Sequence, residues 1–138
     1  MELGCGRAQP VIEGGCAVQK DMLKEIFRLQ ERFDQAVVEH RGVAFSQEMW
    51  IQKEILAIIS ELAEILDEVN FKWWKDPKEI DRERLLEEIV DVLHFFVSMC
   101  LKAGIGPDEL YAAYVRKNHE NFARQEGLTD REGYAWKK

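Results

Sequence analysis

Residues 46–70 read SQEMWIQKEILAIISELAEILDEVN, and this segment gives the first indication of the fold class. Its apolar residues recur at intervals of three and four, which places them along one side of a helix. These residues are Ile51, Ile55, Ile58, Ile59, Leu62, Ile65, Leu66 and Val69. Ser46 is a residue type that caps helix N-termini, so we predict a helix from Ser46 to about Asn70.

Three further segments show the same periodicity, and no segment alternates as a half-buried strand would. They span residues 21–41, 81–103 and about 107–127. Gly42 and Gly104 follow the first two segments and are typical of helix C-termini, while Pro107 suits the first turn of the last. Long helices joined by short connections predict an all-α fold, an antiparallel four-helix-type bundle.

The composition limits the classes of protein to consider. The chain has 138 residues and a formal net charge of −7, which argues against binding a nucleic acid polymer. No apolar run approaches the roughly 20 residues that span a bilayer, and no secretory signal is evident, so we expect a cytoplasmic protein with no membrane partner. Residues 1–19 lack periodicity and are predicted to be a flexible leader before a single domain, 20–138.

Two acidic pairs on consecutive predicted helices point to chemistry. Glu61 and Glu64 lie on the first, and Glu88 and Asp91 on the second. Each pair is spaced i,i+3, so its carboxylates share one helix face. Glu88 falls within the apolar arc, where an unpaired carboxylate would cost at least several kcal/mol. If the four converge between antiparallel helices, a hard divalent ion such as Mg²⁺ would neutralise them.

Other interpretations of these acids are open. A single acidic pair is ordinarily a solvated helix face, although a second pair makes that explanation weaker. A di-iron carboxylate bundle requires Glu-x-x-His motifs, and the chain offers only Asp91 with His94 on one helix. Glu68, one turn beyond Glu64, either joins a metal site or supports it by hydrogen bonding.

Four blocks of sequence carry a family resemblance. They are LQERFD at 29–34, ELAEILDEVNFKWW at 61–74, EEIVDVLHFF at 87–96 and YVRKNHENFARQ at 114–125. The ExxE pair, 23 intervening residues and the ExxD pair also follow one another in the order of a known signature. Over about residues 21–134 the chain resembles the dimeric dUTPases of the all-α, MazG-like nucleoside triphosphate pyrophosphohydrolase superfamily.

The resemblance implies Mg²⁺-dependent hydrolysis of dUTP to dUMP and pyrophosphate, with attack on the β-phosphorus. It also implies a homo-oligomer, either a dimer or a dimer of dimers. The metal ligands would be Glu61, Glu64, Glu88 and Asp91, with Glu61 also orienting or deprotonating the attacking water. The alternatives are a MazG-like or dCTPase-like enzyme with another base preference, or a non-catalytic helical interaction module.

The same resemblance nominates residues that contact substrate. Lys117, Asn118, Asn121 and Arg124 match the family's phosphate-contacting block, and Lys72 and Lys75 are further phosphate candidates. For the base, the nominated residues are Gln30, Trp74, His94 and Phe95. An aromatic ring can stack on a uracil, and an amide can bind its edge. The ordinary alternative is core packing for the aromatic residues and a satisfied buried histidine for His94.

Overall fold

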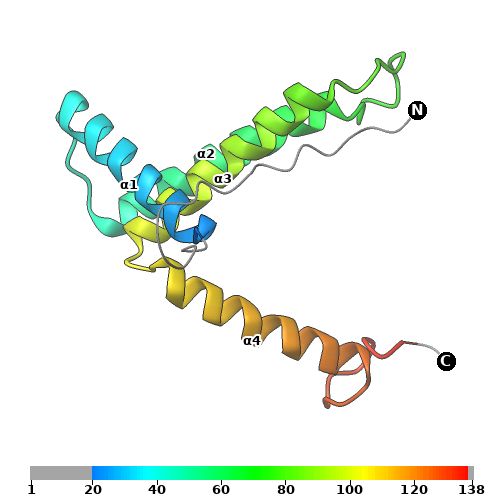
Figure 1. Ribbon diagram of the computed structural model, residues 1–138. Helices are drawn as coiled ribbons and strands as arrows, with labels where there is room; N and C mark the ends of the chain where they lie inside the picture. The colour runs from blue at the N-terminus through cyan, green and yellow to red at the C-terminus, as the bar shows by residue number, and fades with distance from the viewer. Residues whose placement is uncertain (1–19, 137–138) are drawn as a thin grey trace, which may run out of the picture.

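The computed structural model describes residues 20–136, which form four α-helices and no strand (Figure 1). The helices are α1 (Met22–Arg41), α2 (Gln47–Glu68), α3 (Arg82–Lys102) and α4 (Pro107–Gln125). The predicted all-α class is confirmed, and each predicted helix is present to within a few residues. The predicted leader, residues 1–19, lies outside the described residues.

Local capping sets where the helices begin and end. Asp21, Ser46 and Asp81 each precede a helix and accept a hydrogen bond from a backbone N–H in its first turn. Such caps stabilise a helix by about 1 kcal/mol each. Gly42 ends α1 with a left-handed φ of 60°, and its N–H donates to the carbonyl of Val38 at 2.9 Å. A residue with a Cβ would be strained at this φ, which accounts for the glycine.

Helices α2 and α3 form an antiparallel hairpin, the most extensive packing in the described chain (Figure 1). At one end, Gln47 Nε2 donates to the carbonyl oxygen of Lys102 at 3.0 Å. At the other end, Arg84 pairs with Glu68 at 3.1 Å. The two ends are therefore fixed in register, and side chains midway along α2 face side chains midway along α3.

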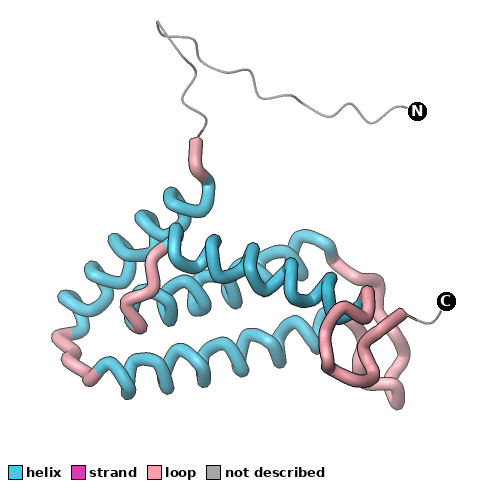
Figure 2. The backbone as a smooth tube through the Cα atoms, turned by 90° about the horizontal axis from the view of Figure 1, so that it is seen from below, coloured by secondary structure: helices cyan, strands magenta, loops and turns pink. Residues whose placement is uncertain are grey.

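Helix α1 crosses the C-terminal half of α3, and the buried apolar core lies at this crossing. Phe27, Val97 and Cys100 form it. Helix α4 contacts α1 but, within the described chain, neither α2 nor α3. The chain bends by 108° between α3 and α4. In Figure 1 α4 diverges from the hairpin, and Figure 2 shows it from below, running across the view in front of the other helices.

Large apolar side chains are unusually exposed in this fold. Only three apolar residues of the 20–136 range are buried, whereas Leu62, Leu66 and Leu93, for example, are each more than 40% exposed. In the same range, no single helix combines the length and the apolar composition needed to cross a bilayer, although the bent pair of α3 and α4 meets those two criteria together.

Candidate active site

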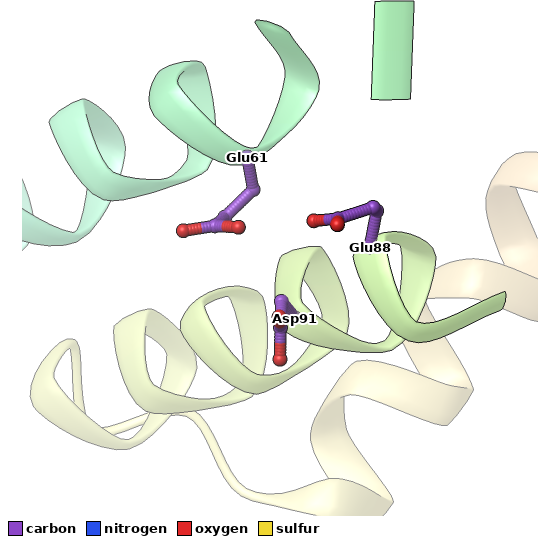
Figure 3. Close-up of side chains that lie close together, drawn as sticks. All are labelled: Glu61, Glu88 and Asp91. Atoms are coloured by element: carbon purple, nitrogen blue, oxygen red, sulfur yellow. The ribbon is translucent and has the colours of Figure 1, made fainter. Parts of the chain in front are cut away.

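Three carboxylates converge midway along the α2–α3 hairpin (Figure 3). Glu61 comes from α2, and Glu88 and Asp91 come from successive turns of the facing stretch of α3. One oxygen atom from each lies within 4.8 Å of those of the other two. Glu61 and Glu88 are half-buried, while Asp91 is exposed. The hairpin thus brings together three of the four acidic residues that the sequence nominated as metal ligands.

Mutual repulsion and partial burial raise the pKa values of two carboxyl groups in this acidic cluster. The pKa of Glu61 is raised above its usual 4.5, chiefly by partial desolvation and then by the charges of Glu64 and Asp91. The pKa of Glu88 is raised for the same first reason, and next by the charge of Glu64. The fourth nominated ligand, Glu64, is therefore close enough to act on its neighbours.

Within residues 20–136, no protein cation neutralises the cluster. The ion pairs formed by residues 20–136 include none of Glu61, Glu64, Glu88 and Asp91. The available donors are all carboxylate oxygens, and one side of the cluster is open to solvent. Mg²⁺ prefers oxygen ligands and retains some of its water, so this donor set fits it.

A pocket of about 570 Å³ extends from the acidic cluster into the space between α1, α2 and α3. Its volume is in the range of sites that hold a small ligand. The lining residues are Gln30, Phe33, Asp34, Val37, Val38, Trp50, Glu54, Glu61, Asp91, His94, Phe95, Ser98 and Lys102. The acidic cluster is therefore one end of a larger site, and the rest of the pocket is available to the remainder of a ligand.

Three of the four nominated base-binding residues line this pocket. They are Gln30, His94 and Phe95. His94 Nδ1 lies 2.6 Å from Gln30 Oε1, and Gln30 Nε2 donates to Asp34 at 2.8 Å. Gln30 is buried, so these contacts fix its amide, and a fixed amide can read the edge of a base.

Eight pocket residues were not nominated as site residues from the sequence: Phe33, Asp34, Val37, Val38, Trp50, Glu54, Ser98 and Lys102. Asp34 follows Gln30 by one helical turn, and that i,i+4 spacing was the signal for it. Glu54 is on the same stripe of α2 as Glu61. No local signal distinguishes Trp50 or Ser98. Trp50 is held by an edge-on contact with Phe45, whose ring centroid lies 4.9 Å away.

Two nominated lysines and Trp74 lie elsewhere, in the loop that follows α2. Lys72 pairs with Asp67 at 2.6 Å, and with Lys75 it lines a second hollow next to Glu68. Trp74 is 59% exposed and does not line the pocket beside the acidic cluster. The phosphate and stacking roles suggested for these residues stay predictions.

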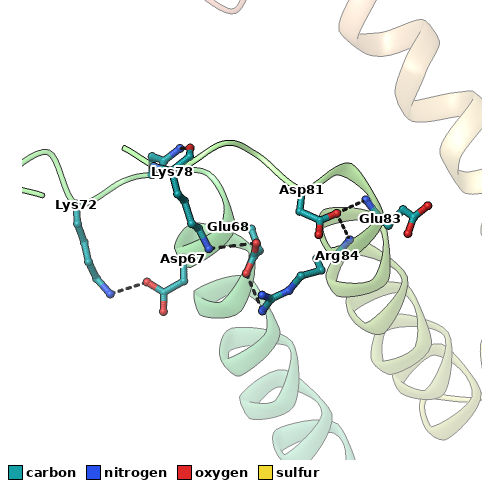
Figure 4. A network of polar contacts seen from close by, with 8 residues as sticks. Asp67, Glu68, Lys72, Lys78, Asp81, Glu83 and Arg84 are labelled. Atoms are coloured by element: carbon teal, nitrogen blue, oxygen red, sulfur yellow. Dashed lines mark hydrogen bonds and ion pairs between the residues drawn. The ribbon is translucent and has the colours of Figure 1, made fainter. Parts of the chain in front are cut away.

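Glu68 is neutralised by cations, in contrast to the acidic cluster (Figure 4). Its side chain is buried, and Arg84 lies 3.1 Å and Lys78 3.3 Å from its two carboxylate oxygens. Of the roles that the sequence left open for Glu68, the contacts favour a supporting one. Its charge is used to fasten α2, α3 and the loop between them.

The four nominated phosphate-contacting residues are on α4, away from the acidic cluster. Lys117 pairs with Glu120 at 3.2 Å, and Arg124 donates to Asn121 at 3.3 Å. At about 1.5 Å per residue, Lys117 lies about 15 Å and Arg124 about 25 Å beyond the start of a helix that diverges from the hairpin. The described chain alone does not bring Lys117, Asn118, Asn121 or Arg124 to the cluster, and their phosphate-contacting role stays a prediction.

An all-α fold with a carboxylate cluster beside a largely apolar pocket that contains a few polar side chains defines a class of protein suited to bind a divalent metal together with a small ligand. The sequence model of a family described as dUTPase matches residues 22–109, which is more than half of the chain. The chain therefore belongs to this dUTPase family.

Two relatives are named for a substrate with a different base, dCTP. The dCTP pyrophosphatase of Enterobacteria phage LZ5 is 31% identical over 75 residues, a match that covers 54% of this chain and 44% of the relative. The dCTP pyrophosphatase of Enterobacteria phage T4 is 32% identical over 88 residues, which covers 54% and 52%. The chain thus spans about half the length of the curated relatives it matches. No solved structure gives a significant match.

Proposed function

We propose that the chain hydrolyses a pyrimidine deoxynucleoside triphosphate to the monophosphate and pyrophosphate, with Mg²⁺ as cofactor. One observation carries this proposal: the acidic cluster of Glu61, Glu88 and Asp91 opens into the pocket that contains Gln30 and His94. Family membership supports dUTP, the substrate that the sequence predicted. The names of the relatives support dCTP.

The pocket suggests how the substrate lies. The phosphates belong at the acidic end, where Glu61, Glu88 and Asp91 would hold Mg²⁺ with Glu64 beside them, and the base belongs near Gln30. When bound there, Mg²⁺ would supply the positive charge that the carboxylates and the phosphates lack. Glu61 would then orient the attacking water or accept its proton.

Product analysis tests this function directly. We would incubate the protein and Mg²⁺ with each common NTP and dNTP and measure pyrophosphate and orthophosphate. The proposal expects pyrophosphate and dUMP or dCMP, and orthophosphate as the primary product would refute it. Hydrolysis in ¹⁸O-labelled water then locates the attacked phosphorus: label in pyrophosphate means attack at the β-position, and label in the monophosphate means attack at the α-position.

The rival function, a non-catalytic helical interaction module, is separated by calorimetry. We would titrate the protein with Mg²⁺ and with a non-hydrolysable dUTP or dCTP analogue in the presence of Mg²⁺. The proposed enzyme binds both the ion and an analogue, whereas a module with decorative surface acids binds neither. Glu61→Gln provides the matched control, because it removes one charge from the cluster and keeps the size of the side chain.

We also infer that the chain acts as a homo-oligomer, as the family resemblance implied. The α2–α3 seam includes Glu61 and Glu88, and the residue that follows each of these, Leu62 or Ile89, is apolar and more than 40% exposed. Exposed apolar residues at similar positions around each helix, next to the side that faces the partner helix, form two apolar stripes along the hairpin. Their members are Ile55, Ile59, Leu62, Leu66 and Val69 of α2, and Leu86, Ile89 and Leu93 of α3.

Helix geometry puts both stripes on one side of the hairpin. At 100° per residue, Asp91 is about 200° from Ile89, so the apolar side faces away from the exposed acids. A continuous exposed apolar surface of this kind marks a contact with another protein. A second copy of the chain can cover it without closing the pocket. We expect wild type to sediment as a dimer or larger, Leu62→Glu as a monomer, and Ser60→Glu, a control on an exposed polar position, as wild type.

A further inference from the structure

A continuous hydrogen-bonded network of polar side chains runs through the pocket. It passes from α2 to α3, then to α1, and returns to α3. Ser98 Oγ lies 3.0 Å from Glu54 Oε1 and 2.7 Å from Asp34 Oδ2. Gln30 Nε2 donates to Asp34 Oδ1 at 2.8 Å, and Gln30 Oε1 lies 2.6 Å from His94 Nδ1. Each member of this network lines the pocket, and Glu54, Ser98 and Gln30 are buried.

The number of available protons determines which groups of this network donate and which accept. The Ser98 hydroxyl has one proton but lies within hydrogen-bond distance of two carboxyl groups, so one of those groups must donate to it. Burial raises the pKa of Glu54 and outweighs the opposing effect of the hydrogen bond with Ser98, and the charge of Asp34 raises this pKa further. This direction favours Glu54 as the group that holds the extra proton, in which case Glu54 donates to Ser98 and Ser98 donates to Asp34. The Asp34 carboxylate remains an acceptor only.

The Asp34 carboxylate in turn orients Gln30 and His94. Because Asp34 accepts on both oxygens, Gln30 must turn its NH₂ group toward Asp34 and its carbonyl oxygen toward His94. The 2.6 Å contact then requires that His94 Nδ1 carries the proton and donates. In the neutral ring Nε2 is left with a lone pair, so the part of His94 that is free to meet a ligand is an acceptor.

We propose that Asp34 is the specificity-determining residue of the pocket and makes it select cytosine over uracil, a proposal that rests on the function proposed above. The polar end of the pocket offers two acceptors, His94 Nε2 and the Asp34 carboxylate, and one free N–H of Gln30. The N4 amino group of cytosine has two protons to donate, and the adjacent N3 accepts. Uracil has a carbonyl oxygen in place of the amino group, and this oxygen is repelled by a carboxylate.

The test compares kcat/KM for dCTP and dUTP. Wild type should prefer dCTP, and Asp34→Asn should shift the ratio toward dUTP by on the order of tenfold or more. The reason is that an Asn side chain can turn its NH₂ group toward Gln30. The Gln30 amide can then flip, and the proton of His94 can move from Nδ1 to Nε2. Glu54→Gln is the matched control: it is also a change from carboxyl to amide in the same network, but the amide NH₂ group of Gln can donate to Ser98 in place of the Glu54 carboxyl group. We expect it to leave the ratio unchanged.

A second measurement does not depend on turnover. Nitrogen-15 NMR of the histidine ring should show His94 with its proton on Nδ1 in wild type, and a changed or mixed tautomer in Asp34→Asn. Wild-type preference for dUTP, or an active Asp34→Asn enzyme with an unchanged ratio, would overturn the selection by Asp34. A His94 proton on Nε2 in wild type would also overturn it. Failure of wild type to hydrolyse any nucleotide would instead refute the proposed function, and the two failures are thereby distinguished.

Discussion

Helix α2 faces α3 with three glutamates spaced seven residues apart, Glu54, Glu61 and Glu68. The surroundings of Glu61 and Glu68 differ in whether they contain protein cations. At the middle of the hairpin, Glu61 faces Glu88 and Asp91, and no cation of the described chain joins them. At its end, Glu68 is held by Arg84 and Lys78. Residue type and helix face are the same in both regions. The residue supplied by α3 decides whether the glutamate fastens the hairpin or remains as an uncompensated charge.

This contrast predicts that function and stability separate between the two regions. A carboxylate paired with cations gains its favourable interactions on folding. A carboxylate among other carboxylates is destabilised until an external cation arrives. The Glu68 region should therefore stabilise the fold, and the Glu61 region should be held ready for a metal at some cost to the stability of the metal-free protein.

The largest expected effect is on turnover. Glu61→Gln should lower kcat by about a thousandfold, since in the proposed function Glu61 is a metal ligand and also the group that handles the attacking water. Glu68→Gln should keep kcat within about twofold, since its carboxylate contacts only protein cations. Circular dichroism should show the same helical content in both variants. If Glu61→Gln kept wild-type turnover, the assignment of the cluster as the catalytic metal site would be wrong.

The next effect is stabilisation by the metal. A ligand that binds only the folded state at 100 times its Kd raises the free energy of unfolding by about 2.7 kcal/mol. Thermal unfolding with increasing Mg²⁺ should show this gain for wild type and Glu68→Gln, but little of it for Glu61→Gln. An equal gain in all three proteins would mean that Mg²⁺ binds somewhere other than the acidic cluster.

Much of the fold followed from local sequence, because its determinants are local. Ser46 and Gly42 act within one turn of the helix ends that they define, so the boundaries of α1 and α2 could be predicted. The course of α4 could not. The 108° bend after α3 depends on how the short connection and the contacts with α1 combine, and neither leaves a periodic signal.

In the site, too, local spacing predicted some of the contacts and could not predict others. Glu88 and Asp91 share a face by simple spacing, and the antiparallel partner of that face could be inferred from the short connections. By contrast, Ser98 and Asp34 meet across 64 positions of sequence. No spacing rule pairs them. Aromatic type alone gave no reason to nominate Trp50, which lines the pocket, and the stacking role nominated for Trp74 stays a prediction.

A smaller effect should appear in the stability of the cation-paired region. Glu68→Gln should lower the free energy of unfolding by about 1–2 kcal/mol, because a buried carboxylate with two cations becomes a neutral amide while those cations remain partly hydrated. Arg84→Gln should act similarly. In denaturant titrations the double variant should lose less than the sum of the single losses, as expected of partners in one network. Additive losses would show that Glu68 and Arg84 act independently.

The smallest effect concerns Glu54, the third glutamate of the series, which faces Ser98. Burial raises the pKa of Glu54 in the folded protein above the ordinary 4.5, so the folded chain keeps a proton that the unfolded chain loses. The contribution of this group to stability is therefore fully present below about pH 4.5 and is lost as the pH rises through the raised pKa of the folded state. Glu54→Gln cannot titrate. Its free energy of unfolding relative to wild type should therefore increase with pH over that window and level off above it, while other titrating groups cancel in the difference. A difference that stayed constant with pH would show that Glu54 is ionised in the folded protein, and the proton on Ser98 would then be shared between two carboxylates.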